Sequence, residues 1–171
     1  MTRSTSKSLF VFGAASVMLA GCASVTDRFR DADTRWADYK SWEKVSETPS
    51  TGPSPGLGAV HKGPEGFRFV YVNAVGREVI KGEGPYDYPE GTVIVKEQYD
   101  DQAAFEAGGQ PDVTVSLKVA DVAGGGKDNW HWADSYKSTA GESAFCSGCH
   151  SVPLATDFVF SNATYLAENE R

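Results

Sequence analysis

Five consecutive residues near the end of the chain, Cys146-Ser147-Gly148-Cys149-His150, combine two thiols with an imidazole. This C-x-x-C-H pattern is the attachment signature of a c-type haem. In such sites the two thiols add to the vinyl groups of the haem, and the histidine on the same turn binds the iron as proximal ligand. Two nearby cysteines in an oxidising compartment can instead form a disulfide or a redox-active pair. The histidine that follows at once favours one covalently bound haem c.

The first 21 residues predict an export signal, and the third cysteine predicts a lipid anchor. Arg3 and Lys7 precede an apolar run over residues 9–20, which is too short to span a bilayer and typical of a signal peptide. The run ends in Leu19-Ala20-Gly21-Cys22, which resembles the lipobox of bacterial lipoproteins and makes Cys22 the expected lipidated N-terminus. An ordinary cleaved signal with an incidental cysteine is the alternative. Both interpretations place the mature chain in the periplasm, and the absence of aspartate after the cysteine favours the outer membrane.

The charge of the chain restricts its partners. The formal net charge is −7, and loss of the two leader cations lowers it to −9. An acidic surface argues against nucleic acid and anionic lipid headgroups as partners. It suits a small neutral or cationic substrate, or a basic periplasmic electron acceptor such as a cytochrome c. A homodimer is also compatible with the sequence.

The second axial ligand of the haem iron cannot be methionine. Met1 and Met18 both lie in the leader, so the mature chain contains none, and the His/Met ligation of many electron-transfer cytochromes is excluded within the chain. The remaining candidates are His61, His131 and Lys96, or an open site. We expect His61 to be a solvated loop residue and His131, between two tryptophans, to be packed in a strand. An open site is therefore favoured, which indicates binding of a substrate or gas.

Hydrophobic periodicity predicts the elements that must position these residues. Residues 27–45 predict an amphipathic helix, with Trp36, Tyr39 and Trp42 on one face. Residues 48–66 are rich in proline, glycine and serine and predict an extended linker, and residues 82–91 predict a turn-rich loop. Aromatic and β-branched runs predict four strands, over residues 67–73, 92–99, 112–122 and 129–136.

Strands at this spacing, without helices between them, predict an α+β fold. We expect an antiparallel sheet of four to five strands, with an N-terminal helix and a C-terminal haem-bearing segment. The expected domain organisation is a signal peptide over residues 1–21, a lipidated tether over 22–34, a haem domain over 35–162 and a tail over 163–171.

Four segments, together with the C-x-x-C-H motif, resemble the cytochrome P-460 family. Tyr88-Pro89-Glu90-Gly91-Thr92-Val93-Ile94-Val95-Lys96-Glu97 is similar to the P-x-G-T-x-x-V-K-E signature of that family. The other segments are the preceding strand at 67–73, Asn129-Trp130 in the following strand, and the D-x-V-F segment within 156–161. Their order and spacing fit from about Trp36 to Asn162.

The resemblance implies roles for particular residues. Lys96 matches the lysine that can bond to a meso carbon of the haem, and Arg68 matches an arginine of the distal pocket. The alternative for Lys96 is a solvent-facing lysine on the strand, and the alternative for Arg68 is a cation on the strand surface. Relatives also carry a distal carboxylate, for which Glu97 and Glu142 are loose candidates. The period of two places Lys96 and Glu97 on opposite faces of their strand, Lys96 with Thr92, Ile94 and Gln98.

Two functions follow from the resemblance and the open site, and a third interpretation fills that site with a histidine. If Lys96 is cross-linked, the protein resembles the enzymes that oxidise hydroxylamine to nitrogen oxides at a five-coordinate haem, and we favour this interpretation. Without the cross-link, the same fold corresponds to a cytochrome c′-beta that binds or detoxifies nitric oxide, with Phe67 or Phe69 crowding the distal face. A bis-histidine electron carrier using His61 or His131 is the third interpretation.

Overall fold

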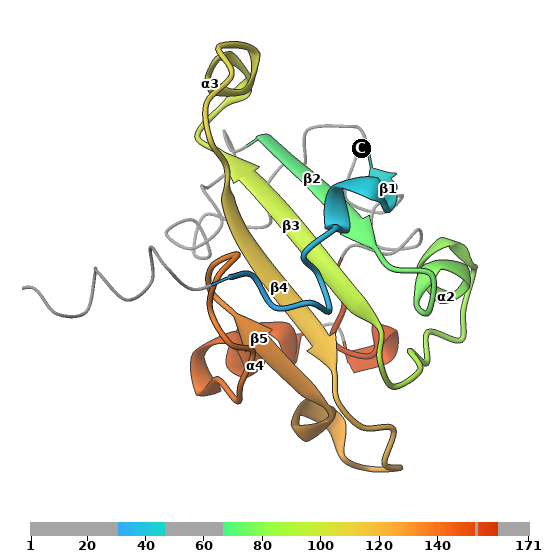
Figure 1. Cartoon of the computed structure of the whole chain (residues 1–171). Coiled ribbons are helices and arrows are strands. Elements are labelled where there is room, and N and C mark those ends of the chain that lie inside the picture. Colours follow the sequence, from blue (N-terminus) through green and yellow to red (C-terminus); the bar gives the residue numbers. More distant parts are fainter. Residues whose placement is uncertain (1–30, 47–66, 153, 161–171) are drawn as a thin grey trace, which may run out of the picture. The chain divides into compact units, whose positions relative to one another are not determined.

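A computed structural model describes residues 31–46, 67–152 and 154–160 (Figure 1). Its centre is a sheet of five antiparallel strands, each paired with the next along the chain, in the order β1-β2-β3-β4-β5. The strands are β1 (Glu43–Ser46), β2 (Phe67–Val72), β3 (Val93–Tyr99), β4 (Asp112–Lys118) and β5 (Trp130–Ala133). This arrangement confirms the predicted antiparallel sheet and the α+β class.

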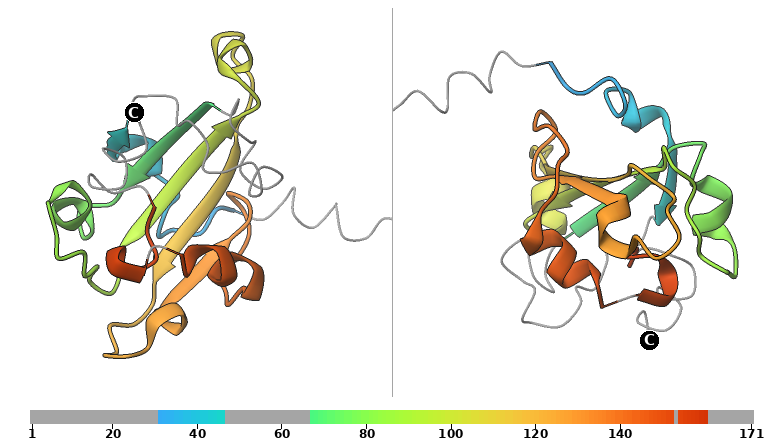
Figure 2. Two further views of the ribbon diagram at one scale, coloured as in Figure 1. Left: turned by 180° about the vertical axis from the view of Figure 1, so that it is seen from behind. Right: turned by 90° about the horizontal axis from the view of Figure 1, so that it is seen from below.

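The connections are short helices. They are the α-helices α2 (Arg77–Lys81), α3 (Gln102–Glu106) and α4 (Ala144–His150), and the 3-10 helices η2 (Tyr39–Ser41), η4 (Gly126–Asn129) and η5 (Leu154–Thr156). α4 contains the whole C-x-x-C-H motif, and η5 follows α4 along the chain. Both helices lie on the same side of the sheet, as the views in Figure 2 agree.

The sheet separates two hydrophobic clusters because alternate residues of each strand point to opposite faces. On one face the residues from 31 to 42 pack over β2, β3 and β4, and Trp36 and Tyr39 are buried there (Figure 2). On the other face α4 and the segment after it pack over β5 and its neighbours, and Trp130, Trp132 and Phe158 are buried. The described core is therefore built on both sides of the sheet.

The predicted N-terminal helix is wrong over the described residues. Residues 34–38 form turns, η2 is a single 3-10 turn, and β1 occupies the end of the predicted helix. Tyr39 lies three residues after Trp36, a spacing that also fits successive tight turns, and both side chains reach the core that way. Pairing of β1 with the edge of β2, in a register that brings Lys44 opposite Tyr71, overrides the local preference for helix.

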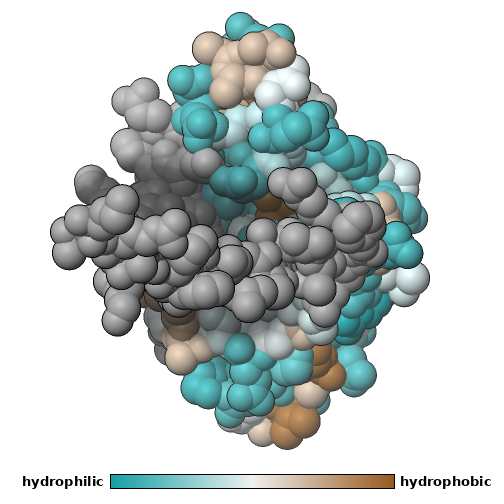
Figure 3. Space-filling model, turned by 60° about the vertical axis from the view of Figure 1, so that its left-hand side comes forward, coloured by the Kyte–Doolittle hydropathy of each residue, from teal (hydrophilic) through white to brown (hydrophobic). Residues whose placement is uncertain are grey.

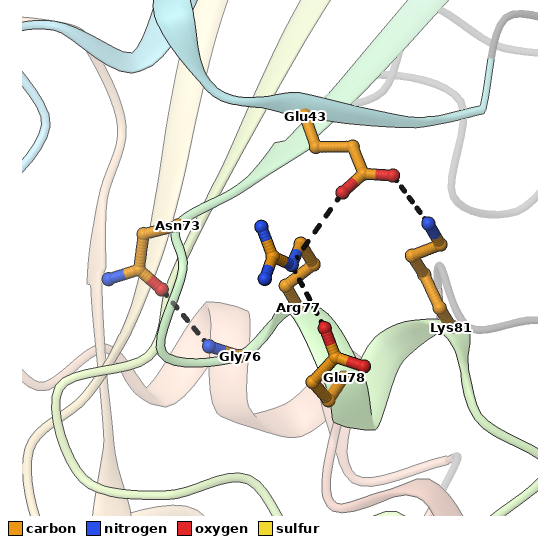
Figure 4. Close-up of polar contacts among 6 residues, drawn as sticks. All are labelled: Glu43, Asn73, Gly76, Arg77, Glu78 and Lys81. Atoms are coloured by element: carbon orange, nitrogen blue, oxygen red, sulfur yellow. Dashed lines mark hydrogen bonds and ion pairs between the residues drawn. The ribbon is translucent and has the colours of Figure 1, made fainter.

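A polar network attaches α2 to the edge of the sheet (Figure 4). Glu43 of β1 forms ion pairs with Lys81 and Arg77 of α2. The side-chain oxygen of Asn73 accepts a hydrogen bond from the backbone nitrogen of Gly76, at 3.3 Å. A side chain at Gly76 would meet Thr92 at 2.4 Å, so this turn lies tightly against the start of β3.

The predicted leader, tether, linker and tail lie largely or wholly outside the described residues, and with them Cys22 and His61. Within the described part of the chain, no helix has the length and apolar character needed to cross a membrane. The described surface in Figure 3 is mainly hydrophilic, with small hydrophobic areas. Of the large apolar side chains, Phe145 and Val152, which flank the motif, are among the most exposed.

Candidate functional site

Helix α4 presents the two cysteines of the motif. Ser143 begins the helix, and its side-chain oxygen accepts a hydrogen bond from the backbone nitrogen of Cys146 at 3.2 Å. This cap satisfies one of the free N–H groups of the first turn. Cys146 and Cys149 are half-buried and are both free thiols, so the structure does not support the disulfide interpretation. Two reduced sulfurs on one short helix are the arrangement that covalent haem attachment requires.

The ring of His150 is oriented by the segment after the motif. Its Nδ1 lies 2.7 Å from the carbonyl oxygen of Phe158, and because a carbonyl only accepts, Nδ1 carries the proton. The other ring nitrogen, Nε2, is thereby left as the metal-binding atom. Trp132 and Phe160 pack beside the ring, with centroids 6.0 and 5.3 Å away. Burial lowers the pKa of His150, which favours the neutral ring that a metal needs.

Lys96 faces the helix that carries the motif. It lies in the middle of β3, directly opposite Val70 of β2 and Thr114 of β4. Its pKa is lowered to about 7, mainly by burial and then by the guanidinium of Arg68, while Cys146 acts in the opposite sense. The charge of Lys96 also lowers the pKa of His150, so Lys96 interacts electrostatically with both Cys146 and His150. Lys96 therefore lies half-buried on the face of the sheet that α4 covers, a position that does not fit the alternative of a solvent-facing strand lysine.

Arg68 lies on the same face as Lys96, one pair further along the sheet. It is directly opposite Gln98, and its side chain is 3% exposed, so the surface-cation alternative is wrong. Asp112 pairs with Gln98 from the other side and is exposed at the first residue of β4. The sequence analysis did not single out Asp112 or Gln98 as site residues. The alternation of β3 was a signal that could have found Gln98, because it places Gln98 on the same face as Lys96. Asp112 could not be found in this way, because its position beside Gln98 depends on the register between β3 and β4.

Glu97 does not belong to this site. It is buried on the opposite face, where the hydroxyl groups of Tyr39, Tyr71 and Tyr99 donate to its carboxylate at 2.7, 3.3 and 3.5 Å. As a candidate for the distal carboxylate it is therefore wrong. Phe67 and Phe69 belong to the same cluster as these tyrosines, so the expectation that one of them crowds the haem is wrong as well. Glu142 is exposed just before α4, in a surface hollow lined also by Trp132 and Ser147.

His131 also faces away from the motif. It pairs with Leu117, which belongs to the hydrophobic cluster that contains Tyr39 and Tyr71. Its neighbours Trp130 and Trp132 belong instead to the cluster beside α4. The bis-histidine interpretation through His131 is therefore not supported by the geometry.

The residues on the Lys96 face fit a bound haem. Two buried polar atoms there, Trp132 Nε1 and Gln98 Oε1, have no hydrogen-bond partner among the described residues. Such atoms are costly unless a bound group satisfies them. No cluster of three or more histidine, cysteine or acidic residues in the described ranges could hold a bare metal ion. One histidine, two thiols and the apolar residues around them instead suit haem, in which a porphyrin ring already holds the iron.

A comparison with models of known protein families agrees with this geometry. The sequence model of the family described as Cytochrome P460 matches residues 36–161, most of the chain. The match includes β1 to β5, the motif on α4 and the segment that contacts His150. No curated protein matches the chain.

Proposed function

The chain belongs to the cytochrome P460 family and is a haem protein, and on this premise we propose that it oxidises hydroxylamine to nitrogen oxides at one covalently attached haem. The observation that carries the proposal is the inward orientation of Lys96. Cys146 and Cys149 would form the thioether bonds, and His150 Nε2 would bind the iron. The Lys96 amine would replace the hydrogen on a meso carbon of the ring, with loss of two protons and of two electrons to an external oxidant such as a peroxide. The haem, when bound, supplies an open iron coordination position and accepts electrons from the substrate.

The electrostatics of Lys96 suit a covalent bond to the ring. A nitrogen nucleophile must be unprotonated, and a pKa of about 7 leaves a large fraction of the amine neutral near neutral pH. An ordinary exposed lysine, with a pKa near 10.4, is almost wholly charged there.

Other residues on this face are suited to the substrate. Arg68 is buried beside Lys96 and would orient a small polar ligand through its N–H groups. Oxidation of hydroxylamine also releases protons, which need an acceptor. Within β2 to β5 as described, Asp112 is the acidic residue on the Lys96 face, and we propose it for this role. Asp112→Asn should then slow turnover more than it weakens binding of hydroxylamine.

Nitric oxide binding of the cytochrome c′-beta type is the second candidate function. It is favoured by the two residues directly opposite Lys96, because Val70 and Thr114 are not proton acceptors. A protein of this type needs an open, largely apolar distal site and no proton relay. The two functions differ in whether Lys96 is bonded to the ring.

We also propose a periplasmic location, with an anchor at Cys22 in the bacterial outer membrane and a periplasmic cytochrome c as electron acceptor. The acidic composition of the chain supports a basic acceptor. The apolar side chains of Phe145 and Val152 beside the motif would contact such a partner close to the haem.

Turnover of hydroxylamine by the purified holoprotein, with an artificial electron acceptor, tests the proposed function. We expect wild-type protein to consume hydroxylamine and Lys96→Leu to lose this activity while it keeps its haem. Wild-type protein that binds nitric oxide but does not consume hydroxylamine would contradict the enzyme and favour the second candidate.

A further inference from the structure

The carbonyl group that orients His150 lies in a strained turn. Among the described non-glycine residues, positive φ angles occur at Asp157 and Phe158, 48° and 66° respectively. A bulky residue seldom adopts this left-handed region, and such strain persists only where the surrounding structure enforces it. Phe158 is also the residue whose carbonyl accepts the hydrogen bond from His150. The contacts that enforce the turn therefore decide where this carbonyl points.

Those contacts converge on the carboxylate of Asp157. Its Oδ2 accepts hydrogen bonds from Lys118 Nζ at 2.5 Å and from the backbone nitrogen of Tyr88 at 3.1 Å. Its Oδ1 accepts a hydrogen bond from Trp130 Nε1 at 3.2 Å. The donors come from β4, from the loop before β3 and from the start of β5. One side chain thus attaches the segment after α4 to two strands of the sheet and to the loop before β3.

Stability alone is a weak explanation for the ion pair between Lys118 and Asp157. Lys118 is 2% exposed, and its ammonium group also lies 5.3 Å from the centre of the Trp130 ring. A buried ion pair gains little over well-packed apolar residues, because both charges must lose their hydration. The ion pair instead fixes the orientation of the turn, because the residue after Asp157 is Phe158, whose carbonyl faces His150.

We propose that Lys118 and Asp157 are positioning residues for the proximal ligand. They hold the carbonyl of Phe158 against His150 Nδ1 and so set how strongly the imidazole donates electrons to the haem iron. This inference rests on the part of the proposed function that makes His150 the iron ligand. It does not depend on hydroxylamine as the substrate or on the bond to Lys96.

The direction of the effect follows from the hydrogen bond. A carbonyl that accepts the Nδ1 proton makes the imidazole a stronger electron donor, which favours ferric over ferrous iron and lowers the reduction potential. Asp157→Asn replaces an acceptor oxygen with an amide N–H group that faces donors, so the turn should relax. The balance between the two iron states should then move about tenfold towards ferrous, a rise of about 59 mV for one electron.

The test is the reduction potential of the purified holoprotein, together with the iron–histidine stretching frequency of the ferrous form. Asp157→Asn and Lys118→Met should raise the potential and lower the frequency. Trp130→Phe, which removes one hydrogen bond to Asp157 and keeps the ring, should cause a smaller shift in the same direction. Glu97→Gln is the matched control, because it alters a buried carboxylate on the opposite face and should change neither quantity.

The outcomes separate this inference from the proposed function. Wild-type protein without haem would overturn both. Haem-loaded Asp157→Asn with the potential and frequency of the wild type would overturn this inference alone. If Asp157→Asn does not fold, Trp130→Phe decides in the same way, and an unchanged potential in that variant overturns the inference.

Discussion

Lys96 and Glu97 are consecutive residues of β3, but their side chains lie on opposite faces of the sheet in unlike surroundings. Lys96 faces the helix that carries Cys146, and burial lowers its pKa to about 7. Glu97 is enclosed by tyrosines, the closest of which, Tyr39, donates to it at 2.7 Å. One strand therefore places the amine of Lys96 on one face of the sheet and the buried carboxylate of Glu97 on the other.

Replacement of Lys96 with leucine should change the haem spectrum without removing the haem. The thioether bonds to Cys146 and Cys149 do not involve β3, so attachment should be complete in Lys96→Leu. The loss of the bond to the ring should shift the ferrous absorption to that of an ordinary haem c. Optical spectra of the purified variant and wild type give the comparison.

Glu97→Gln is the matched control for that variant. Its ferrous spectrum should equal that of the wild type, whereas its free energy of unfolding should fall by about 1–3 kcal/mol, because buried hydroxyl groups lose a charged acceptor. A large spectral change in Glu97→Gln would show that the two faces of the sheet are not independent.

Haem attachment should depend on both thiols of α4. In cells that assemble haem c, wild-type protein should retain haem after denaturation, and Cys149→Ala should retain much less or none. Ser147→Ala, which lies on the same helix and keeps both thiols, should keep a full complement of haem. Intact mass of the denatured proteins measures this, and a wild-type mass equal to the bare polypeptide would contradict the assignment.

The alternation of residues allowed much of the sheet to be predicted, and the long-range contacts of the site could not be. Val113, Val115 and Leu117 alternate in β4 and lie together in one cluster, as the period of two of a strand requires. The opposite orientation of Lys96 and Glu97 followed from the same period of two, whereas the choice of Lys96 as the haem-facing residue came from the family resemblance. By contrast, the ion pair of Lys118 with Asp157 joins residues 39 positions apart, and local pattern says nothing about it.

The errors have a similar cause. Trp36 and Tyr39 have a spacing that suits a helix, yet tight turns bury them equally well, and pairing of β1 with β2 decides the structure there. Glu97 was a loose candidate for the distal carboxylate, although the period of two placed it on the face opposite Lys96. The structure buries it among tyrosines on that opposite face.

Alkaline pH should unfold the protein as its buried tyrosines ionise. Burial, and then the charge of Glu97, raise the pKa of Tyr39, Tyr71 and Tyr99 above the ordinary value of 10.0. Since the folded state favours the protonated phenols, their contribution to stability is complete below pH 10 and is lost as the pH rises above it. Tyrosinate absorbance and far-ultraviolet circular dichroism should therefore change together.

The same titration separates the effect of the Glu97 charge on the tyrosine pKa values from the effect of burial. In Glu97→Gln the negative charge is gone, so the pKa of these tyrosines should fall towards the ordinary value and ionisation should begin at lower pH. Ionisation of all the tyrosines near pH 10 in wild-type protein that remains folded would contradict the buried cluster.

The predicted lipid anchor can be tested at Cys22. Wild-type protein should fractionate with membranes and require detergent for release, because acyl chains would hold it. Cys22→Ser should release the protein or stall its processing. If that variant matures normally and stays in the membrane fraction, the anchor lies elsewhere.

The bond between Lys96 and the haem ring is the central claim, and mass spectrometry of peptides from protease-digested wild-type protein tests it most directly. We predict one species in which the peptide containing Lys96 and the peptide containing Cys146 and Cys149 are joined through a single haem. Lys96→Leu should yield haem on the cysteine peptide alone. If the wild-type Lys96 peptide is recovered free, with the haem attached only through the cysteines, the claim is contradicted.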